Sequence, residues 1–158
     1  MGNGHTSNYQ IQEKMMHLNK QISEFEKLDV KHRRTRSMTW VEAEDRYLDL
    51  LEKSDKYACI IQDSKVRLIT SNLASLVGYT PEEITDSLMV HYIHIDELPK
   101  LIKNYFKRMA GEEVPPLYRT ILKHKDGSRV YVEINAGVIP YRGKPADFAI
   151  IRYLARRK

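Results

Sequence analysis

Three residues with metal-binding side chains lie close together in the sequence, at His91, His94 and Asp96. Two imidazole nitrogens and a carboxylate oxygen are ligands that Zn²⁺ accepts. One further carboxylate, Glu97, is nearby, and no second pair of histidines accompanies the segment. Because Asp96 also has the chemistry of a helix N-cap, we interpret the segment as the entry to a helix and expect no metal site.

The sequence contains no pattern of covalent catalysis. It lacks the G-x-S-x-G and P-loop motifs and a cysteine–histidine pairing signal. The paired carboxylates Glu82-Glu83 and Glu112-Glu113 fall at a helix start and in a polar loop. The single cysteine, Cys59, lies in an apolar run, whereas a reactive thiol needs a cationic, accessible setting. We therefore expect that the protein is not an enzyme.

Length and composition indicate one domain with extensions. A chain of 158 residues can bury a core of its own, and its 42% hydrophobic and 30% charged residues are typical of proteins that work in water. It has neither an apolar run long enough to span a membrane nor the apolar segment of a signal peptide. These features predict a cytoplasmic protein without a membrane span.

The excess positive charge of +5 lies in residues 57–158, and part of it is the basic tail at residues 155–158; a second basic run lies at residues 31–36. Either run could bind nucleic acid or acidic lipid by electrostatic attraction. No interleaved aromatic residues and no DNA-reading motif accompany them. We interpret them as a solvated linker and a solvated terminus, and we do not expect a nucleic-acid partner.

Residues 1–38 carry a narrow apolar stripe with the four-and-three spacing of a coiled-coil seam, followed by the basic linker. The positions between the apolar ones are mostly polar or charged, so a lone helix could not bury the stripe in water. Its partner is either the same segment of a second chain or the domain that follows. The stripe consists of Ile11, Met15, Leu18, Ile22 and Phe25.

A second amphipathic helix is predicted over residues 39–56. Thr39 and Glu42 have the spacing of a capping box, in which each side chain accepts a hydrogen bond from the other residue's backbone N–H. The apolar residues of this helix lie toward one broad side. They include Tyr47, Leu48 and Leu51.

Residues 57–155 are predicted to form an α+β domain. An Asp-Gly turn at residues 126–127 between alternating runs is a strong hairpin signal. Two strands, then three or four helices, then three strands favour a five-stranded antiparallel sheet with helices packed on one face, preceded by the N-terminal helices. The predicted strands cover residues 57–62, 66–70, 117–124, 129–136 and 146–154, and the predicted helices cover 72–77, a restart at 80, and about 96–110.

The stretch LVGYTPEEI, residues 76–84, has the features of a helix stop followed by a capped restart. Gly78 can take the left-handed conformation that ends a helix. Thr80 and Glu83 have the spacing of a capping box, and Pro81 falls at the first helical position, where no N–H is needed.

Several short motifs of this domain occur in the order and spacing of one family. They are Asn72 with Ala74, Gly78-Tyr79, Glu82-Glu83, His94–Glu97, Lys125–Ser128 and Val132–Ile134. With them, residues 55–154 resemble the PAS sensory domains of sensor histidine kinases and related signalling proteins. Two places depart from that pattern: Ile95 replaces a proline, and residues 152–155 replace a D-I-T-like motif.

The resemblance implies a PAS fold and a homodimer. PAS dimers commonly pair through a helix that precedes the first strand and lies on the outer face of the sheet. In this chain the seam over residues 11–25 would extend the dimer contact. The covering helix would use Trp40, Tyr47, Leu48 and Leu51.

PAS domains often hold a cofactor between the sheet and the helices. The chain lacks the cysteine of the flavin-photoreceptor subtype after Asn72, and residues 97–110 lack the histidine of the haem subtype, so both subtypes are disfavoured. Non-covalent FAD or a small metabolite remains open. The residues that would line a cavity, or else pack in the core, are Tyr92, Leu101, Tyr105 and Phe106.

We therefore predict a cytoplasmic PAS sensory or interaction module in signal transduction, which binds a small ligand or a partner and signals through a dimeric N-terminal helix. The alternative is a ligand-free PAS adaptor that docks onto a histidine kinase or a transcription regulator. Because no effector module follows up to Lys158, we expect a separate effector. A mixed polar and apolar cavity would favour the sensor, whereas a filled core would favour the adaptor.

Overall fold

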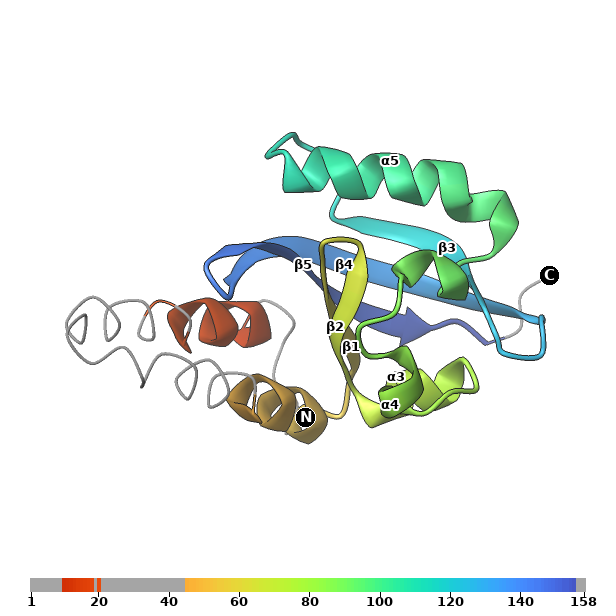
Figure 1. Cartoon of the computed structure of the whole chain (residues 1–158), viewed down its shortest axis with the longest axis horizontal. Coiled ribbons are helices and arrows are strands. Elements are labelled where there is room, and N and C mark those ends of the chain that lie inside the picture. The colour runs from red at the N-terminus through yellow and green to blue at the C-terminus, as the bar shows by residue number, and fades with distance from the viewer. Residues whose placement is uncertain (1–9, 19, 21–44, 156–158) are drawn as a thin grey trace.

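A five-stranded antiparallel sheet forms the centre of the structure, with the strand order β2-β1-β5-β4-β3 (Figure 1). The structure is a computed structural model that describes residues 10–18, 20 and 45–155. The predicted α+β fold and antiparallel sheet are confirmed. The strands are β1 (Tyr57–Gln62), β2 (Lys65–Ile69), β3 (Leu117–Lys123), β4 (Arg129–Tyr141) and β5 (Lys144–Tyr153).

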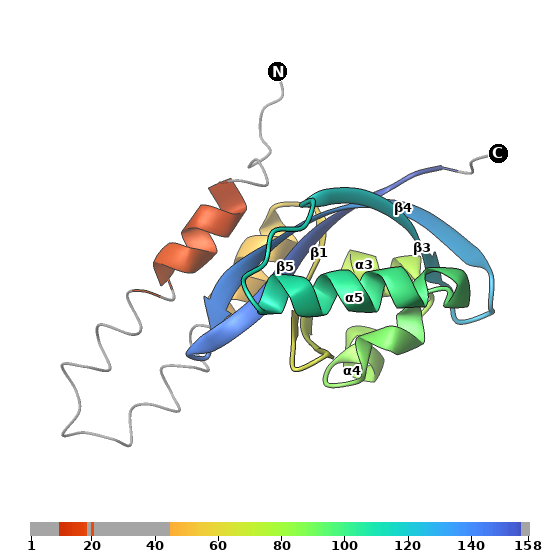
Figure 2. The ribbon, with the colours of Figure 1, turned by 90° about the horizontal axis from the view of Figure 1, so that it is seen from above.

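The segment between β2 and β3 covers one face of the sheet, called here the inner face (Figure 2). It consists of α3 (Ser71–Leu76), α4 (Pro81–Ile84), α5 (Leu98–Met109) and two short 3₁₀ helices, Met89–Tyr92 and Ile95–Glu97. No helix in the described part of the chain is long and apolar enough to cross a membrane.

Strand β5 lies in the middle of the sheet and is buried on both faces. Successive side chains of a strand point to opposite faces, so its residues divide into two sets. Asp147, Ala149 and Ile151 point to the inner face, under the helices. The set on the outer face consists of Ala146, Phe148 and Ile150.

Two helical segments, residues 10–18 and 45–53, cover the outer face. Ile11 and Met15 of the first segment are fully buried, as is Leu51 of the second. The Tyr47 hydroxyl donates a hydrogen bond to the backbone oxygen of Met15 at 3.1 Å, which ties the two segments together. The sheet is therefore covered on both sides (Figure 2).

The apolar seam of the first segment is thus partly occupied by this chain's own sheet. The sequence leaves two partners open for this seam, a second chain or the following domain. Ile11 and Met15 contact the following domain. Leu18 and Leu48 are half-buried. Ile22, Phe25 and Trp40 lie outside the described residues, as do residues 31–36.

The β4–β5 hairpin is longer than predicted. The sequence predicts a strand over residues 129–136, but β4 continues to Tyr141 although Pro140 cannot donate to a strand ladder. Pro140 faces Pro145 across the hairpin, one pair away from the two-residue turn. That pair needs no N–H donors, because hydrogen-bonded and non-hydrogen-bonded pairs alternate. Positive φ angles at Arg142 (54°) and Gly143 (79°) form the tight turn.

The helix stop and restart within LVGYTPEEI are confirmed. Gly78 has a φ of +87°, and a Cβ there would lie 2.5 Å from the imidazole of His124. The Glu83 N–H donates to the Thr80 hydroxyl at 3.2 Å, and the Thr80 N–H donates to the Glu83 carboxylate at 2.9 Å. Pro81 occupies the first turn of α4.

The predicted N-cap at Asp96 is wrong. A short 3₁₀ helix, Ile95–Glu97, precedes α5, and Glu97 occupies the N-cap position without a side-chain hydrogen bond. The Asp96 N–H instead donates to Nδ1 of His94 at 3.1 Å. Residues 95–97 form a 3₁₀ turn with its own hydrogen-bond pattern, so α5 begins only at Leu98.

Replacing Thr80 by alanine tests this capping box. We expect Thr80→Ala to lower the free energy of unfolding by about 1 kcal/mol, because the Glu83 N–H loses its acceptor. Urea unfolding followed by circular dichroism measures the change. Thr80→Ser keeps the hydroxyl and should remain close to the wild type; equal losses in both variants would contradict the role of the cap.

Candidate functional site

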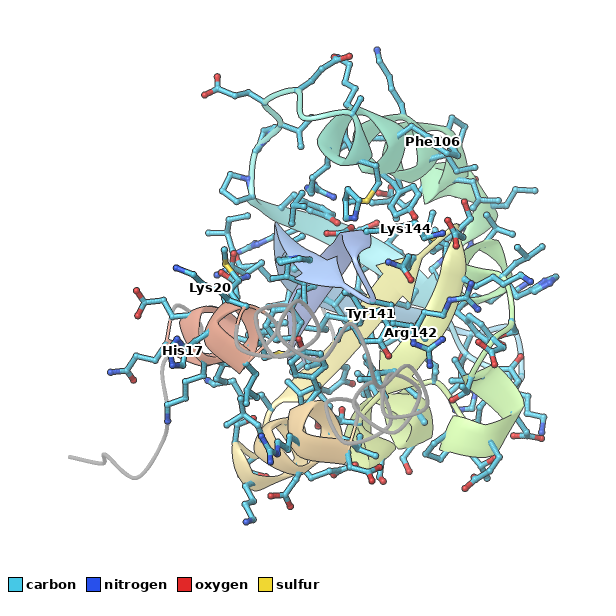
Figure 3. All side chains as sticks on the ribbon, turned by 60° about the vertical axis from the view of Figure 1, so that its left-hand side comes forward. His17, Lys20, Phe106, Tyr141, Arg142 and Lys144 are labelled. Atoms are coloured by element: carbon cyan, nitrogen blue, oxygen red, sulfur yellow. The ribbon has the colours of Figure 1, made fainter. Side chains whose placement is uncertain are left out.

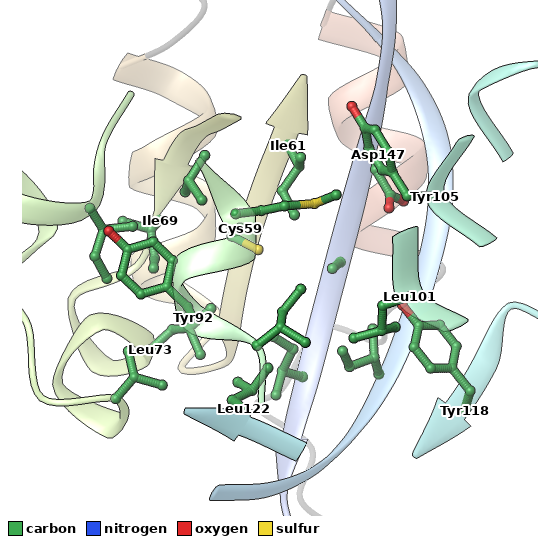
Figure 4. A pocket seen from close by; sticks show the side chains of 18 of the residues that line it. Cys59, Ile61, Ile69, Leu73, Tyr92, Leu101, Tyr105, Tyr118, Leu122 and Asp147 are labelled. Atoms are coloured by element: carbon green, nitrogen blue, oxygen red, sulfur yellow. The ribbon is translucent and has the colours of Figure 1, made fainter. Parts of the chain in front are cut away.

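A cavity of about 90 Å³ lies between the inner face of the sheet and the helices (Figure 4). It has room for several waters, since one water requires roughly 10–15 Å³ measured in this way. Residues of all five strands form its floor, and residues of α3, α4, α5 and the segments between them form its roof. Its apolar wall consists mainly of Cys59, Ile61, Val66, Ile69, Leu73, Val77, Ile84, Met89, Ile93, Leu122, Ile134, Ala149 and Ile151.

Three of the four residues predicted to line a cavity do so. Leu101 and Tyr105 project from α5, and Tyr92 projects from the 3₁₀ helix Met89–Tyr92 (Figure 4). The Tyr105 hydroxyl accepts a hydrogen bond from the Ser64 N–H at 3.0 Å. The Tyr92 and Ser87 hydroxyls are hydrogen-bonded to each other at 2.6 Å. These bonds hold both aromatic rings at the edge of the cavity.

The prediction that Phe106 lines the cavity is wrong. Phe106 is 56% exposed and lies on the surface of α5, near Lys144 of the β4–β5 hairpin (Figure 3). One residue along a helix corresponds to a rotation of about 100°, so Tyr105 and Phe106 cannot both face the sheet. The apolar spacing of α5 fits either residue, and only the packing identifies Tyr105 as the inner one.

One end of the cavity is charged, which sequence reasoning missed. Arg108 in the last turn of α5 and Asp147 in β5 form an ion pair, with Nη1 and Oδ2 separated by 3.0 Å. The two residues are only 6% and 4% exposed. A signal for Arg108 exists in the sequence: it follows Tyr105 by three positions and Leu101 by seven, so all three share one face of the helix.

Burial controls the electrostatics of this charged end. Loss of hydration raises the pKa of the Asp147 carboxyl to about 6, although the charge of Arg108 and its hydrogen bond act in the opposite direction. Burial also raises the pKa of Tyr118 to about 12, and the nearby Asp147 contributes to that rise. The Arg108 guanidinium lies over the Tyr118 ring, 5.8 Å from its centre.

The ion pair leaves one polar atom of each partner without a hydrogen bond. Asp147 Oδ1 and Arg108 Nη2 are buried and have no partner among the described residues. Most buried polar atoms of folded proteins are paired, because an unpaired one costs about 1–3 kcal/mol. The cavity therefore combines a long apolar wall with one unsatisfied donor and one unsatisfied acceptor.

The chemistry of the site suits binding. Burial raises the pKa of the Cys59 thiol to about 12, and the charge of Asp147 raises it further, so the thiolate nucleophile is suppressed. His91, His94 and Asp96 do not form a metal-binding group, and no cluster of three metal-ligating side chains occurs in the part of the chain that the structure describes.

Comparison with known proteins identifies the fold. No family model and no curated protein matches the chain. A solved PAS domain from Desulfitobacterium hafniense is similar, with a TM-score of 0.60 and 20% sequence identity over 67% of this chain and 99% of that one. The chain has a PAS fold.

Two further similar solved structures are PAS domains of regulatory proteins. The PAS domain of a LuxR-family transcriptional regulator from Burkholderia thailandensis, solved in complex with ethanol, has a TM-score of 0.57 and 11% identity, over 70% of this chain and 98% of that one. A PAS domain from a two-component sensor histidine kinase has a TM-score of 0.54 and 11% identity, over 72% and 99%.

The pH dependence of stability tests the environment of Asp147. Its pKa of about 6 in the folded state exceeds the value of about 3.9 of an unfolded chain, so the native state holds this proton more firmly. The stabilisation that this bound proton gives the folded state is fully present below about pH 4, and it is lost as the pH rises to about 6. Two pH units correspond to a loss of about 3 kcal/mol.

The measurement is urea unfolding from pH 4 to pH 6, for the wild type and Asp147→Asn. Surface carboxylates with lowered pKa values, such as Glu133, titrate in both proteins and cancel in the difference. We expect the stability of the wild type relative to the variant to fall across this range. A constant difference would contradict the raised pKa.

Proposed function

We propose that this chain is a PAS sensory module of signal transduction, in which a small molecule in the cavity changes the packing of the N-terminal helices. The observation that carries the proposal is the position of β5, whose inner side lines the cavity and whose outer side contacts those helices. The proposed role is non-enzymatic, and the proposed location is the cytoplasm.

Strand β5 offers a short path between the two sides. Asp147 faces the cavity, and the next residue, Phe148, belongs to the same outer cluster as Ile11 and Met15. A displacement of β5 that improves contact with a ligand therefore also changes the surface on which the helices pack. A ligand shifts such an equilibrium only by its difference in affinity for the two packings.

The size of the cavity restricts the ligand. About 90 Å³ is well below the roughly 300 Å³ at which pockets for drug-sized ligands begin, so a molecule of a few heavy atoms fits and non-covalent FAD does not fit this conformation. The ethanol complex of the LuxR-family PAS domain is consistent with a ligand of this size.

The second candidate function is a ligand-free adaptor, and the small cavity volume favours it. In that role the core is structural, and the helices or the exposed sheet surface bind a histidine kinase or a transcription regulator. The similarity to PAS domains of such proteins supports a signalling partner of this kind for either candidate.

Coupling between the helices and the cavity separates the two candidates, and it is reciprocal, so it can be tested without a ligand. Met15→Ala removes a fully buried side chain from the outer face, and we expect it to shift the methyl NMR signals of Ile61 and Leu101 in the cavity. Lys20→Ala, at an exposed helical position, is the control and should leave them unchanged. Unchanged cavity signals in both variants would exclude the sensor mechanism and favour the adaptor.

We also propose that the module is a homodimer that pairs through its N-terminal helices. Ile11 and Met15 are buried against the chain's own sheet and are not free to contact a second chain. The dimer contact would therefore use the surface groove beside them. Met16, Leu18 and Leu50 give this groove an apolar wall. Such a pairing would place the N-terminal helices of the two chains side by side.

Light scattering on the full chain measures the oligomeric state. We expect twice the mass of one chain, and we expect Met16→Glu to weaken the dimer at least tenfold by placing a charge in the groove. Lys20→Glu, at an exposed position outside the groove, should leave the dimer intact. A monomer in the wild type would contradict this proposal.

A further inference from the structure

The unsatisfied atoms of Arg108 and Asp147 carry information about the ligand. Both side chains are more than nine-tenths buried, and both line the same cavity. One hydrogen bond, from Nη1 to Oδ2, joins them. Nη2 is left as a donor without an acceptor, and Oδ1 as an acceptor without a donor, within the described residues. A molecule that satisfies both atoms must offer both an acceptor and a donor at its polar end.

The charge of the site favours a neutral ligand. Arg108 and Asp147 are the only residues with a full charge among those that the structure shows lining the cavity, and their charges cancel. The other groups that face them are Cys59, Tyr105 and Tyr118, and burial raises the pKa of each, so all three are neutral at pH 7. An added anion or cation would therefore be buried without a counter-charge, which is costly.

The rest of the wall defines the body of the ligand. Leu101, Ile134 and Ala149 represent its mostly aliphatic lining, and a volume of about 90 Å³ accepts only a short chain. Apolar groups gain free energy in proportion to the area removed from water, so an aliphatic body adds affinity without a need for further polar contacts.

We propose that this cavity binds a small neutral molecule with a short aliphatic body and a polar end that accepts a hydrogen bond from Arg108 Nη2 and donates one to Asp147 Oδ1. Primary amides and alcohols belong to this class. The inference deepens the proposed sensory function and rests on it for its biological meaning, but the binding itself can be tested alone.

Three probes of nearly equal shape separate the alternatives: propionamide, propionate and butan-2-one. Propionamide offers a donor and an acceptor, propionate is an anion, and butan-2-one offers only an acceptor. They are titrated into the full chain and followed by the NMR signals of the Asp147 carboxyl carbon and the Arg108 guanidinium nitrogens. We expect saturable shifts with propionamide, and at least tenfold weaker binding of the other two.

The double variant Arg108→Met with Asp147→Leu is the control. Replacing a buried ion pair by apolar residues of similar size is often neutral or stabilising, so this variant should fold, as circular dichroism can verify. With aliphatic signals of Ile61 and Leu101 as the readout, it should lose the tenfold preference for propionamide over butan-2-one.

Two results would overturn the inference. One is equal binding of all three probes, or tighter binding of propionate. The other is no saturable binding, with ordered waters bridging Nη2 and Oδ1 in a crystal structure of the full chain, since waters would then satisfy both atoms. The proposed sensory function fails separately, when Met15→Ala leaves the cavity signals unchanged. Selective binding of propionamide with no such coupling would keep the ligand class and reject the sensor.

Discussion

The central position of β5 constrains most of the structure. β4 pairs with β5 along the whole length of β5 and β1 pairs with residues 147–151, and the side chains of residues 146–151 are buried on one face or the other. Alternation along the strand then assigns Asp147 to the cavity and Phe148 to the outer layer. Any change in β5 therefore reaches both layers at once, which is the physical basis of the proposed signalling.

The ion pair inside the cavity is difficult to explain by stability alone. Moving two ions out of water costs several kcal/mol each, and a single hydrogen bond between Arg108 and Asp147 returns only part of that cost. The raised pKa of Asp147 has the same cause, because desolvation outweighs the attraction of Arg108. A polar pair of this kind in an otherwise apolar site supports the proposed binding of a ligand in the cavity.

The outer layer follows a simpler rule. Ile11 and Met15 belong to a stripe that a lone helix could not bury, and the sheet supplies the missing apolar surface. Gly137 in β4 permits the close approach: a Cβ there would lie 3.2 Å from the side chain of Gln12. The same helical segment leaves Met16 exposed, so its two sides are suited to different contacts.

Local features of this protein were determined by the sequence. The capping box at Thr80, the positive φ of Gly78 and the strand alternation depend on neighbours a few residues away, and the order of the motifs indicates the PAS fold. The tertiary structure alone decided the rest. It chose Tyr105 over Phe106 as the cavity residue, gave the seam residues Ile11 and Met15 the chain's own sheet, and brought Arg108 to Asp147 from thirty-nine positions away. These contacts depend on which surfaces of distant segments pack together, and the spacing of residues within one segment does not determine that.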